Sequence, residues 1–178
     1  KLENKRCYIE FALKSGGLIS HESPQDAVLL VDSDEIDVNN VAKDLQKSVK
    51  ALLPDNVTGV KIHLRNEVIE GAFYHYTHGL QKHLGQCQRI AHGHRSRIEI
   101  QADGARNAQL EAHWANKLKD SYIATEVHIL DQFQLNGIEH TRMAYHAQQG
   151  DFAISLPSDK VFTMPMESTV ENIAKYLA

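Results

Sequence analysis

Apolar and polar positions along the chain switch between a helical period and a strand period. After Asp37 the apolar residues recur every three or four positions and stop before Pro54, which predicts an amphipathic helix with an aspartate cap. These residues are Val38, Val41, Leu45, Val49 and Leu52. Over residues 60–64 the alternation is instead strict, so we predict a half-buried strand that ends at Glu67.

The same two patterns predict further elements on both sides of this region. Asn107 precedes apolar residues at every fourth position and is expected to cap a helix. A last helix is predicted from Thr169, where Ser168 and Glu171 fit a capping box with the serine as N-cap. Strands are predicted at 8–13, 27–31, 72–78 and 92–100, and a hairpin at 143–147 with 152–156.

Two pairs of short segments repeat at nearly the same offset. PQDAV at 24–28 parallels PSDKV at 157–161, 133 residues later. NVAKDL at 40–45 parallels NIAKYL at 172–177, 132 residues later. The agreement predicts two copies of one strand-then-helix unit, and coincidence is the alternative for matches this short.

Length, charge and cysteine content restrict the class of protein. A chain of 178 residues suits one large or two small domains and can bury a core. A net charge of −4 argues against nucleic acid as a partner. The chain shows no signal peptide and no apolar run of about 18 residues, so no membrane association is expected. Cys7 and Cys87 lie in unrelated contexts, which indicates reduced thiols of a cytoplasmic protein and not a disulfide framework.

Histidines gather between residues 78 and 94. Side chains two apart on a strand point the same way, so His92 and His94 would present two imidazoles to one point. His78 precedes a polar connection, 79–85, whose length can fold back and bring a third imidazole beside the pair. Three neutral imidazoles with an open fourth position are typical of a catalytic zinc site, which leaves Cys87 free as a reactive group.

Two simpler interpretations remain open at this point. The chain has 11 histidines, so some clustering is expected by chance, and Cys87 alone would be a small buried hydrophobe. The glycines favour the site, because Gly93 clears the opposite face while Gly79 and Gly85 bracket the connection as a tight turn or close approach requires.

The order of these residues resembles the 6-pyruvoyl-tetrahydropterin synthase and 6-carboxytetrahydropterin synthase family. The chain reads AFYHYTHGL at 72–80, then Cys87, then HGHR at 92–95. Members of that family carry a catalytic cysteine shortly before a His-Gly-His sequence and hold zinc on three histidines. The resemblance therefore implies zinc as cofactor and Cys87 as the proton-transfer thiol. The implied zinc ligands are His78, His92 and His94.

The resemblance also implies the architecture. Family members have an α+β tunnelling fold, an antiparallel sheet with helices packed on one face, and several units assemble into a barrel with active sites between neighbours. A homo-oligomer is therefore expected. With the internal repeat, we predict two partial tandem units: 1–69, the closing half of a first unit that ends at Glu67, and 70–178, a second unit with the zinc motif. Such incomplete copies imply a segment of a longer tandem protein.

Substrate contacts follow from the same resemblance. The family closes its last strand with a glutamate that holds the pterin, and Glu67 matches that position. A carboxylate can accept two parallel hydrogen bonds from the pterin 2-amino group and a ring N–H, although a solvated strand-end glutamate is the alternative. Thr169 and Glu171 match a Thr-x-Glu near the pterin pocket, while helix capping explains Glu171 fully. The substrates of this family lose a triphosphate group, which needs positive charge to stabilise it as it leaves. We assign this role to Arg89; the alternative is that Arg89 is an ordinary surface cation.

One departure from the family pattern is serious. The family's catalytic set includes an Asp-His pair shortly before that threonine, and residues 152–167 contain no histidine. His128 and His140 each lie close to a glutamate in sequence, but neither matches by position. Either another part of the assembly supplies the pair, or another group transfers the proton, or the protein is impaired.

The function implied is that of a zinc-dependent lyase acting on 7,8-dihydroneopterin triphosphate. The short spacing between Cys87 and His92 is most like that of the 6-carboxytetrahydropterin synthases of queuosine biosynthesis. The alternatives are a 6-pyruvoyl-tetrahydropterin synthase, a non-catalytic zinc- or pterin-binding member that lacks the Asp-His pair, and a zinc hydrolase of another family.

Overall fold

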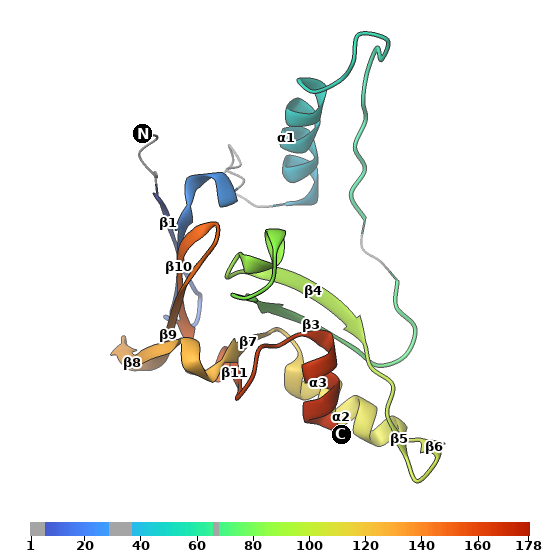
Figure 1. The fold of residues 1–178 in the computed structure, drawn as a ribbon, viewed down its shortest axis with the longest axis vertical. Helices are drawn as coiled ribbons and strands as arrows, with labels where there is room; N and C mark the ends of the chain where they lie inside the picture. The colour runs from blue at the N-terminus through green and yellow to red at the C-terminus, as the bar shows by residue number, and fades with distance from the viewer. Residues whose placement is uncertain (1–5, 29–36, 66–67) are drawn as a thin grey trace. The chain divides into compact units, whose positions relative to one another are not determined.

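The computed structural model describes residues 6–28, 37–65 and 68–178 of the chain. The chain forms two compact units (Figure 1). One combines residues 1–28 with 69–178, and the other consists of residues 29–68. Each unit is described by itself.

The larger unit contains a five-stranded antiparallel sheet in the order β1-β2-β10-β9-β8 (Figure 1). Its strands are β1 (Arg6–Ala12), β2 (Leu18–Pro24), β8 (Ile129–Leu135), β9 (Ile138–Ala147) and β10 (Gly150–Pro157). The predicted hairpin is confirmed, since Met143 on β9 pairs with Ile154 on β10. Asn136 and Gly137 both have positive φ and turn β8 into β9, which is what an Asn-Gly hairpin turn requires.

A second, mixed sheet carries the histidines in the order β11-β7-β3-β4. Its strands are β3 (Phe73–His78), β4 (His92–Arg97), β7 (Ser121–Thr125) and β11 (Val161–Met164). β3 and β4 are antiparallel, whereas β7 is parallel to both β3 and β11. Strands β8 to β10 lie in the chain between β7 and β11, and a long connection of this kind is what a parallel pair needs.

Two helices contribute to the core beside the mixed sheet. α2 (Ala108–Leu118) begins at Asn107, whose side chain accepts a hydrogen bond from the Leu110 N–H at 3.0 Å, as predicted. α3 (Val170–Leu177) follows β11. Their buried residues Leu118 and Ile173 join a core cluster completed by Tyr74, Tyr76, Ile98, Ala115, Ile123 and Met164. Burial of this surface is the main stabilising contribution that fixes β3 and β4.

Short elements complete the larger unit. They are the 3-10 turns η1 (Gln25–Ala27), η2 (Gly85–Gln88), η3 (Glu126–His128) and η4 (Ser158–Lys160), and the two-residue strands β5 (Gln101–Ala102) and β6 (Ala105–Arg106). η2 lies in the connection between β3 and β4, so it belongs to the histidine region.

The smaller unit contains the predicted helix but not the predicted strand. α1 (Val38–Lys50) is capped by Asp37, which accepts hydrogen bonds from the N–H groups of Asn39 and Asn40. Residues 60–65 form no strand, because in the described part of the chain no neighbouring strand pairs with them. The predicted strand 27–31 fails at Ala27, which lies in η1, and its residues 29–31 are outside the described residues.

The α+β class is confirmed, with antiparallel strand pairing and three helices in the described part of the chain. No element was predicted at β2, and the sequence did not indicate that this strand pairs with β10, where His21 is opposite Ile154. This pairing joins residues 6–28 to the larger unit. The tunnelling fold and the tandem units 1–69 and 70–178 remain predictions.

Gly79 is required by close packing where the two sheets meet. A Cβ at Gly79 would overlap the Tyr145 hydroxyl and lie 2.7 Å from the Ile90 Cα atom. A Cβ at Gly93 on β4 would meet only the Tyr76 carbonyl oxygen at 3.9 Å, an ordinary contact. The two glycines therefore form a matched pair for mutation.

We expect Gly79→Ala to lower the free energy of unfolding by about 1–3 kcal/mol, because backbone as well as a side chain must move. Gly93→Ala should leave it unchanged or raise it slightly, since glycine is unfavourable within a strand. Urea denaturation of both variants measures the difference. Equal stability of the two variants would contradict this packing.

Candidate metal centre

The antiparallel register of β3 and β4 brings three imidazoles together. His78 pairs directly with His92, and Tyr76 pairs with His94. Directly opposed strand residues have their Cβ atoms about 4.5–5.5 Å apart, so their side chains meet on one face. The ring centroids are 4.4 Å apart for His78 and His92, 4.9 Å for His78 and His94, and 5.1 Å for His92 and His94.

The nitrogen atoms of the two buried imidazoles are arranged for a ligand. His92 Nδ1 donates to the Arg89 carbonyl oxygen at 2.9 Å, because a carbonyl can only accept. His78 Nδ1 lies 2.8 Å from Ser168 Oγ, and we assign this hydroxyl as the acceptor because it can donate its own proton to the Ile123 carbonyl at 3.4 Å. In both rings the proton is therefore on Nδ1, and Nε2 carries the free lone pair.

Both Nε2 atoms are buried without a hydrogen-bond partner among the described residues. Buried polar atoms are almost always paired. Two neighbouring Nε2 lone pairs without a hydrogen-bond donor therefore indicate a ligand that accepts electron pairs. One nitrogen from each of the three imidazoles lies within 4.8 Å of the others. This donor set fits a divalent cation, and imidazole nitrogen suits Zn²⁺.

The electrostatics agree with a metal site. Burial and then the nearby His92 and His94 rings together lower the pKa of His78 to about 3. Burial also lowers the pKa of His92, against the opposing effect of the Arg89 carbonyl. Both rings are therefore neutral at pH 7, which is the form that binds a metal.

Two buried tyrosines form hydrogen bonds that hold the connection between β3 and β4. Tyr145 on β9 donates to the Gln88 carbonyl at 2.7 Å, and Tyr122 on β7 donates to the Ile90 carbonyl at 2.8 Å. Within the connection, the Leu80 N–H donates to the Cys87 carbonyl at 2.8 Å. Cys87 is thus a free, half-buried thiol on a fixed segment between His78 and His92.

The predicted capping box is wrong. Thr169 is the N-cap of α3, and its hydroxyl accepts from the Asn172 N–H at 3.3 Å. Ser168 is instead fully buried against His78. Glu171 lies in the first turn, where its own N–H and then the Thr169 hydroxyl lower the pKa of its carboxyl. Because 90 residues separate Ser168 from His78, no local sequence signal reveals this contact.

The other candidates are distributed as follows. Glu67 lies outside the described residues. Arg89 follows η2, and its Nη2 reaches the Asp26 carbonyl at 3.4 Å. His140 is fully buried with both ring nitrogens on backbone atoms, those of Leu18 and Ile138. His140 is therefore a structural residue of the five-stranded sheet.

His128, the second histidine considered for the missing pair, is also engaged elsewhere. Its Nε2 contacts the Gln81 Oε1 atom at 3.0 Å, and burial lowers its pKa. It is not among the histidines that share the possible metal position in the described part of the chain.

Comparison with protein families gives one result. The family model described as 6-pyruvoyl tetrahydropterin synthase matches residues 67–178 of this chain, a segment that contains β3 to α3. Comparison with curated proteins and with solved structures found no match. No helix in the described part of the chain has the length and apolar character needed to cross a bilayer.

The His78 environment generates a pH prediction. Its pKa is about 3 in the folded protein against an ordinary value of 6.5, so the unfolded chain binds the proton more readily. Stability of the metal-free protein should therefore fall as pH drops below about 6.5, by up to about 1.4 kcal/mol per pH unit. Urea denaturation in the presence of a chelator, between pH 7 and pH 5, measures this slope.

His78→Gln should flatten that slope by about one proton, because the titrating group is gone. His113→Gln, on the exposed side of α2, is the matched control and should retain the wild-type slope. Identical slopes for wild type and His78→Gln would rule out burial of a neutral imidazole at this position.

Ser168 generates a second prediction. Ser168→Ala should weaken Zn²⁺ binding about 10–100-fold, because the hydroxyl orients His78 and fixes its tautomer. Competition with a chromophoric chelator measures the affinity. Ser168→Thr keeps the hydroxyl and should restore most of it, and Ser121→Ala, which removes a hydroxyl bonded to the Leu118 carbonyl, is the control. A Ser168→Ala protein with wild-type affinity would show that the contact has no orienting role.

Proposed function

Because the chain belongs to the 6-pyruvoyl tetrahydropterin synthase family, we propose that it is a zinc-dependent lyase acting on 7,8-dihydroneopterin triphosphate. Among the products of such enzymes we favour that of 6-carboxytetrahydropterin synthase, of queuosine biosynthesis, on the short spacing between Cys87 and His92. The observation that carries the proposal is a pair of buried Nε2 atoms beside His94, those of His78 and His92, which have no hydrogen-bond partner in the part of the chain that the structure describes.

In this proposal His78, His92 and His94 hold the zinc ion. Bound zinc would act as a Lewis acid that polarises the oxygen-bearing side chain of the pterin and so acidifies its C–H bonds. The protein supplies the orientation: Ser168 and the Arg89 carbonyl fix the two buried rings with their Nε2 atoms toward the cation. Such preorganisation means that little is reordered when substrate arrives.

Cys87 is the proposed acid–base group. As a thiolate it would remove a proton from the substrate side chain and later return one. The Leu80 N–H on the Cys87 carbonyl and the Tyr145 hydroxyl on the next carbonyl hold its backbone. Elimination of triphosphate then requires a cation near the leaving group, which we assign to Arg89.

The pterin ring is assigned to Glu67, Thr169 and Glu171. Thr169 directly follows Ser168, which contacts the proposed ligand His78, and Glu171 is two residues further on, so a pterin beside them would lie close to the cation. We further propose a cytoplasmic homo-oligomer in which neighbouring copies complete the pterin pocket, as the family resemblance implies.

The second candidate is a zinc- or pterin-binding member without catalysis. It is favoured by the positions of His128 and His140, which bond to Gln81 and to backbone atoms and so do not provide the family's Asp-His pair. A 6-pyruvoyl-tetrahydropterin synthase is a further alternative, which differs only in the product released.

We expect Cys87→Ala to lower triphosphate release at least about 100-fold while zinc content is unchanged, because general acid–base catalysis contributes about 10²–10⁴. Cys7→Ala on β1 is the matched control and should retain full activity. Zinc content by metal analysis and product by mass spectrometry are measured together.

The outcomes separate the candidates. Zinc without triphosphate release in the wild type supports the binding protein and contradicts the lyase. Release that survives Cys87→Ala contradicts Cys87 as the acid–base group and supports a zinc hydrolase. The mass of the pterin product decides between the carboxy and pyruvoyl enzymes.

A further inference from the structure

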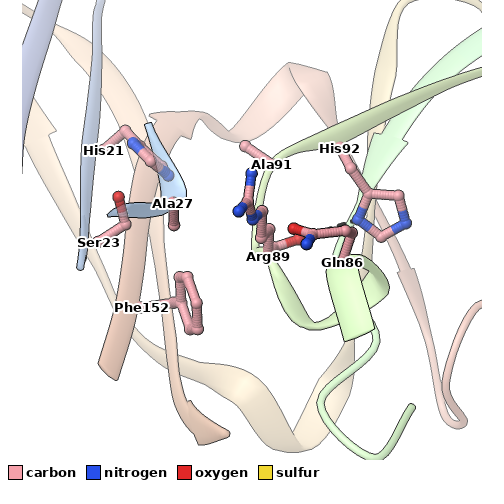
Figure 2. Close-up of a pocket in the computed structure, with 8 residues that line it drawn as sticks. All are labelled: His21, Ser23, Ala27, Gln86, Arg89, Ala91, His92 and Phe152. Atoms are coloured by element: carbon pink, nitrogen blue, oxygen red, sulfur yellow. Dashed lines mark hydrogen bonds between the residues drawn. The ribbon is translucent and has the colours of Figure 1, made fainter. Parts of the chain in front are cut away.

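A pocket of about 350 Å³ lies beside His92, between β2 and the segment that runs from η2 into β4 (Figure 2). As the close-up shows, residues of β2 and η1 form one wall, and residues of the segment from η2 to β4 form the opposite wall. The lining residues are His21, Ser23, Ala27, Gln86, Arg89, Ala91, His92 and Phe152. The volume is at the lower end of the range for ligand sites, about 300–1,000 Å³.

One wall of the pocket lies outside the family match. His21 and Ser23 belong to β2 and Ala27 to η1, whereas the match begins at residue 67. β2 is held there because it pairs with β10, where Ala153 is opposite Glu22 and Ile154 is opposite His21. The pocket is therefore formed by the addition of β2 to the matched segment.

Two buried polar atoms in this pocket have no hydrogen-bond partner among the described residues. Ser23 is fully buried, and its Oγ has no hydrogen-bond partner in the described part of the chain. The Arg89 Nε atom is buried and unpartnered in the same way. The Asp26 carbonyl holds the same guanidinium through Nη2, at 3.4 Å. Unpaired buried donors on facing walls indicate a ligand that accepts hydrogen bonds.

The charge of the lining selects an anion. None of the described residues that line the pocket is acidic, and Arg89 carries a permanent positive charge. His21, Ser23 and Gln86 can each donate a hydrogen bond. The nearby Glu22 carboxylate is engaged by Arg6 at 2.6 Å. A planar guanidinium with additional N–H and O–H donors is suited to the oxygens of a phosphate.

We propose that this pocket binds the triphosphate group of the substrate, with Arg89, Ser23 and His21 as its donors. The proposal rests on the proposed function, in which the substrate carries a pterin at one end and triphosphate at the other. Its side-chain carbons lie between them, at the metal. His92 belongs both to the metal cluster and to the pocket lining, so a chain that passes the cation can enter the pocket directly.

The test is titration calorimetry of the zinc-loaded protein with inorganic triphosphate, which needs no turnover. Arg89→Gln should raise the dissociation constant at least about 10-fold, and Ser23→Ala about 5-fold, as expected for charged and neutral hydrogen bonds to an anion. Arg89→Lys keeps the charge but loses the planar fork, so an intermediate effect is expected.

Matched controls remove the same groups elsewhere. Ser20 lies on the same strand as Ser23 but does not line the pocket, so Ser20→Ala is the control for Ser23→Ala. Arg97→Gln is the control for Arg89→Gln, because it removes a guanidinium that pairs with Glu99 outside the pocket. Both should change the dissociation constant less than about 2-fold. Thermal melts and zinc content verify that each variant is folded and loaded.

Several results would overturn the proposal. Equal affinities in the Ser23, Arg89 and control variants would place the anion elsewhere, including on the metal. Orthophosphate binding as tight as triphosphate binding would indicate a single-phosphate site instead. If triphosphate binds as expected but no pterin is converted, the pocket stands and the lyase activity fails, so the two proposals are separated.

Discussion

The register of β3 against β4 is the constraint on which the candidate site depends. Side chains alternate between the two faces of a strand, so a slip of one residue in β4 would turn His92 and His94 to the face opposite His78. Packing prevents this slip: Tyr74 and Tyr76 lie in the core. On the other face, His75 accepts a hydrogen bond from the opposed Arg95 at 2.6 Å. The clustering of the three imidazoles is thus a consequence of ordinary sheet packing.

Much of the site could be predicted because its signals are local. A His-x-His sequence on a strand and a connection with glycines at both ends determine where three rings meet. The Asp37 and Asn107 caps and the predicted hairpin of β9 and β10 succeeded for the same reason, since each depends on residues near one another in the chain. Each of these features is also reinforced by packing, so local preference and tertiary structure agree.

The remaining features depend on contacts between distant segments. The sequence around Ser168 fits a capping box and so predicted a helix cap. In the structure Ser168 is buried against His78, which is 90 residues away in the sequence. Residues 60–65 alternate like a strand, yet alternation predicts only which faces could be buried and supplies no partner strand. Nothing in the sequence of β2 indicates that it pairs with β10.

That last pairing has a practical consequence for expressing the protein. A fragment cut to the family-matched residues 67–178 would remove β2 and leave the backbone N–H and C=O groups along one side of β10 unpaired. Phe152 and Ile154 lie on this strand and are buried in the intact unit. An open, apolar strand edge recruits strands from other molecules, so such a fragment would tend to aggregate during purification.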